Sequence, residues 1–320
     1  MKRAKYVILC LAVIGCVSLN AWSQEKPKAY RLVIGTGGIA GSYYPLGGAM
    51  ASIWSKNLPN VKVSAQATGA SIENTKLMEN GEIELGLTQN DLAEYAAKKM
   101  YMFDKEYKSL RAIATLFAEH IHIFVNRDSD IKKIVDLKGK RVSVGSQGSG
   151  GLANSQQIFE LFDVSFKDIK PFYLTNIDAC DRMKDGLLDA IFVTTSAPNA
   201  AFQDLAVSKN VRLLSFTDAE VKKIIAKYPF FERVVLGKDT YKGQMQDVTT
   251  VAVLGILIAS KDLDEKVVYD LTKVLWEKKD DIGAIMVKAK EMQPNNPVRG
   301  ITIPIHPGAV RYYKEIGKLK

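Results

Sequence analysis

Residues 32–45, Leu32-Val-Ile-Gly-Thr-Gly-Gly-Ile-Ala-Gly-Ser-Tyr-Tyr-Pro45, join a short apolar run to a glycine-rich loop. The run 32–34 predicts a buried strand. Apolar residues then recur at helical spacing, at Leu46, Met50, Ile53 and Trp54. The free N–H groups and positive dipole end of such a helix point at the loop, and glycine lets a ligand come close. The stretch therefore predicts a site for a small anion.

A second stretch repeats this plan. Residues 141–151, Arg141-Val-Ser-Val-Gly-Ser-Gln-Gly-Ser-Gly-Gly151, again combine a short strand with a Gly/Ser loop, and a helical pattern follows. The segments 77–87 and 182–192 also match, because each has a helix end, a glycine, an acid three residues later and then a strand. Ligands of open α/β sheets bind at the carboxyl ends of the strands, so two facing units predict two α/β lobes with a cleft between them. The alternative is that any α/β protein repeats Gly-rich turns by chance.

The N-terminus predicts export. The basic start Met1-Lys-Arg-Ala-Lys5 precedes an apolar run at 6–17, and the small-residue pattern Ala21-Trp-Ser23 follows, so residues 1–23 are interpreted as a signal peptide. The alternative is Val13-Ile-Gly-Cys16, which resembles a lipobox and would leave Cys16 lipidated and tethered to a membrane. Both interpretations place the protein outside the cytoplasm.

Composition and charge narrow the class of protein. A length of 320 residues, 47% of them hydrophobic, allows two domains with buried cores. The formal charge is +9, and removal of residues 1–23 would leave +6. Basic and acidic residues are interspersed, which argues against nucleic acid as a partner. Of the three cysteines, Cys180 lies outside the predicted signal peptide, and we expect its thiol to be buried and inert.

The sequence favours binding over catalysis. Gly35-Thr-Gly-Gly-Ile-Ala40 fits a dinucleotide pattern, but the strand ending at Thr68 lacks the acid that would bind the ribose. His120 and His122 would share one face of a strand, yet no neighbouring cluster completes a metal site. No nucleophile elbow or supported Ser/His triad is present. We therefore predict no cofactor, no metal and no enzymatic activity.

Two features of the chain organise the predicted lobes. The β-leaning runs 111–125 and 247–259 predict strands that cross between them. Capping patterns predict helices that begin at Ser71 and near Ser196. The predicted domains are a signal peptide at 1–23, the first part of lobe I at 24–120, lobe II at 121–249 and a return to lobe I at 250–320.

The chain resembles the TAXI family, the extracytoplasmic solute receptors of one class of TRAP transporters. The resemblance is carried by residues 34–45, 81–91, 136–150, 184–190 and 306–315. It implies a type II periplasmic binding protein-like α/β fold, in which a monomer captures a small organic acid, glutamate or a 2-oxoglutarate-like compound. It also implies delivery of that acid to TRAP membrane permease subunits driven by an ion gradient.

Neutral donors at helix ends can hold a carboxylate without a buried arginine. The glycines and hydroxyls of both loops are expected to supply these donors, and a tyrosine is expected to form a wall of the pocket. The predicted ligand-binding residues are Gly37, Gly38, Ser42, Tyr43, Tyr44, Thr68, Ser71, Gln89, Ser146, Gly148, Ser149, Gly150 and Thr195. Two other functions stay open: a sensor that presents a small acid to a membrane kinase, and an exported hydrolase that uses Ser149.

Overall fold

A computed structural model of the protein describes residues 28–320. The predicted signal peptide and Cys16 lie outside these residues. Within the described range, no helix combines the length and the apolar character needed to cross a membrane.

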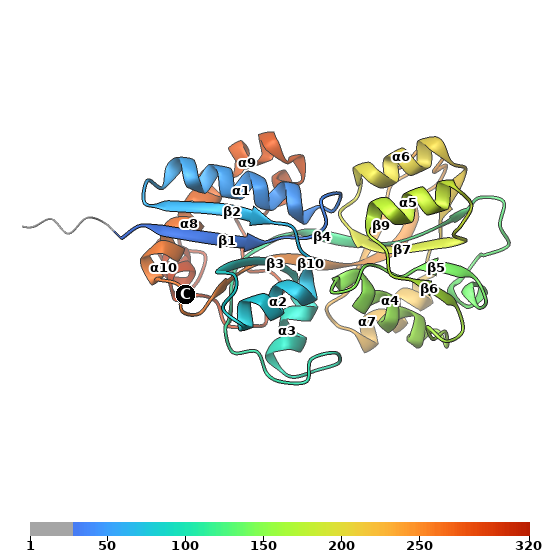
Figure 1. Cartoon of the computed structure of the whole chain (residues 1–320), viewed down its shortest axis with the longest axis horizontal. Coiled ribbons are helices and arrows are strands. Elements are labelled where there is room, and N and C mark those ends of the chain that lie inside the picture. The colour runs from blue at the N-terminus through green and yellow to red at the C-terminus, as the bar shows by residue number, and fades with distance from the viewer. Residues whose placement is uncertain (1–27) are drawn as a thin grey trace, which may run out of the picture.

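One mixed sheet of ten strands runs through both lobes (Figure 1). Its main path is β2 (Val61–Gln66), β1 (Tyr30–Gly35), β3 (Leu85–Gln89), β10 (Val248–Ser260), β4 (Leu110–Asn126), β7 (Ala190–Thr195), β5 (Arg141–Ser143) and β6 (Lys170–Phe172). Two more strands join it: β8 (Val211–Leu213) pairs with β4, and β9 (Glu232–Leu236) pairs with β10. The pairs β1–β2, β1–β3, β5–β6 and β5–β7 are parallel. Each parallel group therefore brings its strand ends together, as α/β units do.

The lobe on the left of Figure 1, lobe I, contains β1 to β3 and both ends of the described chain. Its helices are α1 (Tyr43–Asn57), α2 (Ser71–Glu79), α3 (Asn90–Ala97), α8 (Glu265–Glu277), α9 (Lys279–Ile285), the 3-10 helix η2 (Val287–Glu291) and α10 (Pro307–Glu315). Leu46, Met50 and Trp54 of α1 are fully buried in the core of this lobe. The Trp54 indole also donates a hydrogen bond of 2.9 Å to the carbonyl of Leu271, which ties α1 to α8.

The lobe on the right, lobe II, contains β5 to β9. Its helices are the 3-10 helix η1 (Ile134–Leu137), α4 (Gly150–Leu161), α5 (Asn176–Lys184), α6 (Ala200–Ser208) and α7 (Asp218–Lys227). Phe159 and Phe192 meet edge to face in its core, with ring centroids 5.4 Å apart. Each lobe thus has its own hydrophobic core, as a stable domain needs.

The long strands β4 and β10 pass from one lobe to the other, and the strands predicted at 111–125 and 247–259 are confirmed (Figure 1). They pair antiparallel from Leu110 with Ser260 to His120 with Ala252. Their apolar residues are buried almost throughout, which explains why both runs are so poor in charge. The register shifts next to Gly255, and such irregularities bend strands and often flank functional sites.

In the matching segments 77–87 and 182–192, the acid three residues after the glycine makes the same kind of contact in both lobes. Glu84 accepts a hydrogen bond of 2.8 Å from the N–H of Val33 in β1. Asp189 accepts one of 2.7 Å from the N–H of Arg141 in β5, and its other oxygen binds the Arg141 guanidinium at 2.7 Å. Each acid therefore ties its own strand to the strand that leads into a glycine loop.

The predicted cap at Ser196 is wrong, whereas the helix predicted to begin at Ser71 is confirmed. α6 begins at Ala200 and is capped by Asn199, whose side chain accepts from the N–H of Ala201, because the Ser196 hydroxyl is turned toward lobe I. α2 begins at Ser71 as predicted, but the Ser71 hydroxyl accepts from the N–H of Gln89 and caps nothing. Both serines are used for contacts that are distant in sequence.

Candidate ligand-binding site

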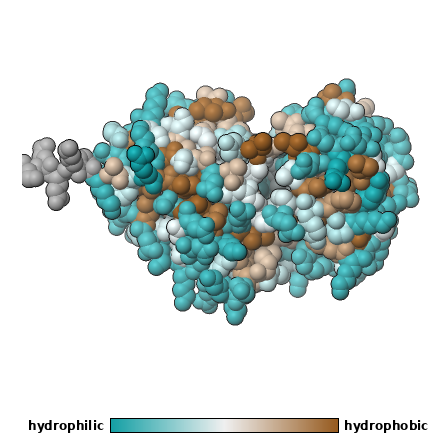
Figure 2. Space-filling model, in the orientation of Figure 1, coloured by the Kyte–Doolittle hydropathy of each residue, from teal (hydrophilic) through white to brown (hydrophobic). Residues whose placement is uncertain are grey.

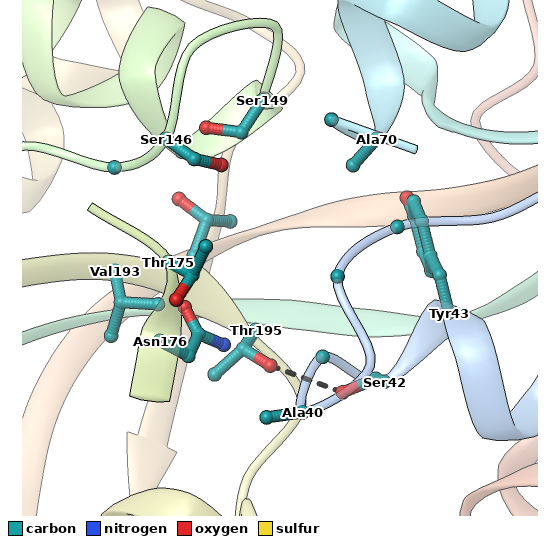
Figure 3. Close-up of a pocket in the computed structure, with 18 of the residues that line it drawn as sticks. Ala40, Ser42, Tyr43, Ala70, Ser146, Ser149, Thr175, Asn176, Val193 and Thr195 are labelled. Carbon is teal, nitrogen blue, oxygen red and sulfur yellow. Dashed lines mark hydrogen bonds between the residues drawn. The ribbon is translucent and has the colours of Figure 1, made fainter. Parts of the chain in front are cut away.

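A cavity of about 390 Å³ lies where the two lobes meet, and Figure 2 shows a hollow between them. Lobe I contributes the loop between β1 and α1, the start of α2 and the end of β3. Lobe II contributes the loop between β5 and α4, the start of α5 and the end of β7. Figure 3 shows Tyr43 and Ala70 on one side of this space and Ser146, Ser149 and Thr175 on the other. The carboxyl ends of strands from both lobes therefore frame one site.

All the predicted site residues except Tyr44 and Gly148 line this cavity. Tyr43 and Tyr44 follow each other on α1, where successive side chains point about 100° apart, so only one of them faces the cavity. Gly148 lies at a contact between the lobes, where its carbonyl accepts hydrogen bonds from the N–H groups of Ile72 and Glu73 at 3.0 and 3.2 Å. For the residues that do line the cavity, contact with a ligand stays a prediction.

Asn74 of α2 fixes the start of the glycine loop of lobe I through hydrogen bonds. Its side-chain amide donates to the carbonyls of Thr36 and Leu87, at 2.6 and 2.7 Å, and so joins the ends of β1 and β3. Gly35 is required for this approach, because a Cβ there would lie 2.6 Å from the Asn74 Oδ1. The N–H groups of Gly37 and Gly38, which follow, have no hydrogen-bond partner within residues 28–320. They are available to an anion.

The loop of lobe II is shaped by its own helix. The Ser149 hydroxyl caps α4 by accepting from the N–H of Leu152 at 3.1 Å. Gly145 has a φ of +96°, a left-handed conformation that favours glycine. At the start of α4, the N–H groups of Gly150 and Gly151 are unpaired in the described part of the chain. A second set of donors therefore faces the cavity from the opposite lobe.

Direct contacts hold the lobes against each other. The Ser42 hydroxyl lies 3.0 Å from the Thr195 hydroxyl, drawn as the dashed line in Figure 3, and 2.6 Å from the Ser196 hydroxyl. Across another part of the interface, the Asn154 amide donates to a carboxylate oxygen of Asp91 at 3.0 Å. Together with the Gly148 carbonyl, these contacts define a closed arrangement of the two lobes.

Sequence reasoning missed Glu119 and the start of α5, where Thr175, Asn176 and Ile177 line the cavity. Glu119 lies on β4, and burial raises its pKa to about 7. A carboxylate within an otherwise apolar, β-leaning run was the signal available, because acids are seldom buried without a role. The start of α5 carried no comparable signal.

The electrostatics of the cavity are unusual for a predicted acid-binding site. Among the described residues, none that lines it is a lysine, arginine or histidine. Its charged side chains are the carboxylates of Glu119 and Asp178. Donors for an anion must therefore come from neutral N–H and O–H groups.

The chain's three histidines all lie within the described residues, and none lines the cavity. The His122 ring bonds to the His120 carbonyl and the Tyr241 hydroxyl, and burial lowers its pKa to about 3. His306 caps α10. In residues 28–320 no group of three or more His, Cys, Asp or Glu side chains is placed to hold a metal ion. The Cys180 thiol is buried, which raises its pKa to about 12.

Residues 34–317 match the NMT1-like family. The chain belongs to the NMT1-like family. This NMT1-like chain also resembles solved structures of low sequence identity. One is a periplasmic transporter, 16% identical, covering 92% of this chain and 94% of that chain, with a TM-score of 0.54. Another is a protein of Listeria monocytogenes named as a putative L-cystine ABC transporter. It is 15% identical, the match covers 83% of this chain and 99% of that chain, and the TM-score is 0.52.

A protein of Bordetella bronchiseptica RB50 is 17% identical, with coverage of 91% of this chain and 89% of that chain and a TM-score of 0.55. At such identities the likeness concerns the fold. The predicted fold class is confirmed: the NMT1-like chain has the α/β fold of type II periplasmic binding proteins, with a mixed sheet and flanking helices.

Proposed function

We propose that this NMT1-like protein is a periplasmic receptor that captures a small organic acid between its lobes. Two glycine loops carry the proposal. They direct N–H groups that are unpaired within the described residues into one cavity, at Gly37 and Gly38 from lobe I and at Gly150 and Gly151 from lobe II. N–H groups at helix starts bind carboxylates well. Glutamate or a 2-oxoglutarate-like acid is the proposed solute, as the TAXI resemblance implies.

The size and closure of the cavity support capture. Its volume of about 390 Å³ is within the range of small-molecule sites. Because donors come from both lobes, a ligand gains all its contacts only when the lobes meet, and this differential binding favours the closed state. The lobes are proposed to divide at 120/121, within β4, and at 249/250, within β10.

Transport is the proposed use of the captured acid. Two similar structures are named as transporter proteins, and the TAXI resemblance points to TRAP permease subunits as partners of a monomeric receptor. The predicted signal peptide at 1–23 supports a location outside the cytoplasm. Catalysis is disfavoured by geometry, because the Ser149 hydroxyl caps α4 and no histidine in the described chain lines the cavity with it.

Native mass spectrometry of the gently purified mature protein tests capture directly. We expect a small acid to co-purify, to be lost on denaturation and refolding, and to raise the melting temperature when it is added back. A protein that is empty after gentle purification, and whose melting temperature ignores panels of amino, oxo and dicarboxylic acids, would contradict the proposal. A bound acid that is chemically converted on incubation would point to the hydrolase instead.

A further inference from the structure

Three buried polar side chains converge on the strand side of the cavity. Glu119 of β4, Gln89 at the end of β3 and Tyr43 at the start of α1 all line it, and each is at most 5% exposed. They meet over Gly255 of β10, which pairs with Gln89 on one side and with Phe117 of β4 on the other. A Cβ at Gly255 would lie 2.7 Å from Glu119 Oε1 and 3.4 Å from Tyr43 Oη. The missing side chain of Gly255 thus leaves room for the carboxylate.

One oxygen atom of each of these side chains lacks a hydrogen-bond partner within residues 28–320. Glu119 Oε1, Gln89 Oε1 and Tyr43 Oη form no hydrogen bond with any described residue. Gln89 Nε2 donates a long hydrogen bond of 3.4 Å to Glu119 Oε2, and the Tyr43 hydroxyl lies near the Glu119 carboxylate. Buried polar atoms are nearly always paired, and an unpaired buried charge is costly. Gln89 Oε1 accepts hydrogen bonds only, and so does Glu119 Oε1 when the carboxyl is ionised, so a group that pairs with both must be a donor.

The charge of the cavity indicates which donor. Asp178, the other carboxylate, is exposed at the start of α5 and already accepts the hydroxyl of Thr175 at 2.7 Å. Glu119 is therefore the buried acid of the cavity, and no cationic side chain in the described part of the lining faces it. Burial, and after it the negative charge of Asp91, raise the pKa of Glu119, and a bound cation would favour the ionised form.

We propose that Glu119, assisted by Gln89, is the subsite for a positively charged amino group of the ligand. The inference rests on the proposed function and makes its solute a zwitterion of the amino-acid class. The N–H groups of the glycine loops bind its carboxylate, and the Glu119 carboxylate binds its ammonium group through charge-assisted hydrogen bonds. A dicarboxylate without an amine would instead place like charges together beside Glu119.

The test compares acids that differ only in an amino or an oxo group. Calorimetry at about pH 8 measures the affinity of L-glutamate against 2-oxoglutarate, L-alanine against pyruvate, and L-leucine against 4-methyl-2-oxopentanoate. In any pair that binds, we expect the amino acid to bind at least about tenfold more tightly to the wild type, since hydrogen bonds to charged groups contribute that much. Glu119→Gln should bring the two affinities within about threefold, without weakening the oxo acid.

Asp178→Asn is the matched control, because it neutralises the other carboxylate of the cavity and should leave the preference intact. Glu119→Gln should keep the wild-type far-ultraviolet circular dichroism spectrum and an unchanged or higher ligand-free melting temperature, since it removes a buried charge. An oxo acid that binds the wild type as tightly as its amino partner overturns the subsite, as does a preference that survives in Glu119→Gln.

When no pair binds, the solute identified by native mass spectrometry decides. A co-purified solute with a basic nitrogen supports the subsite if Glu119→Gln weakens its binding. A co-purified acid without a basic nitrogen overturns the subsite but leaves the receptor function standing. A protein that binds no solute in either experiment contradicts the receptor function itself.

Discussion

The two glycine loops begin alike and end differently. In both lobes an acid, Glu84 or Asp189, fixes the strand that enters the loop. In lobe II the loop serine, Ser149, caps its own helix, α4. In lobe I the loop serine, Ser42, has no capping bond and instead contacts the hydroxyls of Thr195 and Ser196. One sequence pattern therefore supplies a local helix cap in one lobe and a contact between lobes in the other.

The helix starts show the same division. At the N-terminus of α2, the N–H groups of Ile72 and Glu73 donate to the Gly148 carbonyl of the opposite loop. The starts of α1 and α4 face the cavity, and no carbonyl of the opposite lobe accepts from them in the described part of the chain. In the closed arrangement, α2 thus contributes to closure, while the glycine loops keep their donors for the ligand.

The largest expected effect comes from blocking closure at Gly69. A Cβ there would lie 2.7 Å from the Gln147 carbonyl of lobe II and 2.6 Å from a carboxylate oxygen of Glu73. Overpacking of this kind costs about 1–3 kcal/mol, so Gly69→Ala should weaken ligand binding by about 5- to 150-fold. Calorimetry with the co-purified solute measures this loss.

Gly48→Ala is the control, because a Cβ at Gly48, on α1, would meet no atom within 4 Å. It should bind as the wild type does and be slightly more stable, since alanine favours helices. Unchanged affinity in Gly69→Ala would show that the lobes close differently when they hold solute.

The next effect separates the two loop serines. Ser42→Ala removes the hydroxyl that joins Thr195 and Ser196 across the lobes, and should weaken solute binding by about fivefold, about 1 kcal/mol. The ligand-free melting temperature should change little. Thermal unfolding with and without solute gives both quantities.

Ser149→Ala, unlike Ser42→Ala, should lower the stability of the ligand-free protein. It removes the cap of α4, so the free energy of unfolding should fall by about 1 kcal/mol even without solute. Urea titration of the ligand-free variants measures this. If Ser42→Ala and Ser149→Ala lower the ligand-free free energy of unfolding equally, the division of roles between the two loops is refuted.

The smallest effect concerns the two acids. Hydrogen bonds from Arg141 lower the pKa of Asp189, and the ion pair is partly exposed, so Asp189→Asn should lower stability by only about 0.5–1 kcal/mol near neutral pH. A carboxyl whose pKa is lowered by folding stabilises the fold at pH values above its ordinary pKa. This stabilisation is lost as the pH falls through the lowered pKa. The difference between wild type and variant should therefore shrink in acid.

Glu84→Gln is the matched change in lobe I, where Glu84 accepts a backbone N–H but has no cationic partner in the described structure. It should alter stability less than Asp189→Asn and without the same pH dependence. Chemical unfolding at several pH values compares them, and an equal loss in both would mean that the Arg141 charge contributes nothing.

The sequence by itself determined the features that depend on neighbours along the chain. Apolar periodicity placed β1, α1, β4 and β10, because burial of one face or of both leaves a local period. Glycine and serine clusters located both loops, because only certain residues suit such turns. These local signals were enough for the fold class and for the two glycine loops that line the cavity.

The tertiary structure alone decided which side chains meet. Ser42 finds Thr195 at a separation of 153 residues, and Gly148 finds α2 of the other lobe. Glu119 becomes a cavity residue because the register of β4 on β10 sets it beside Gly255. Local sequence patterns do not predict such pairings, because the register of β4 on β10 and the contacts between the lobes follow from the packing of the whole chain.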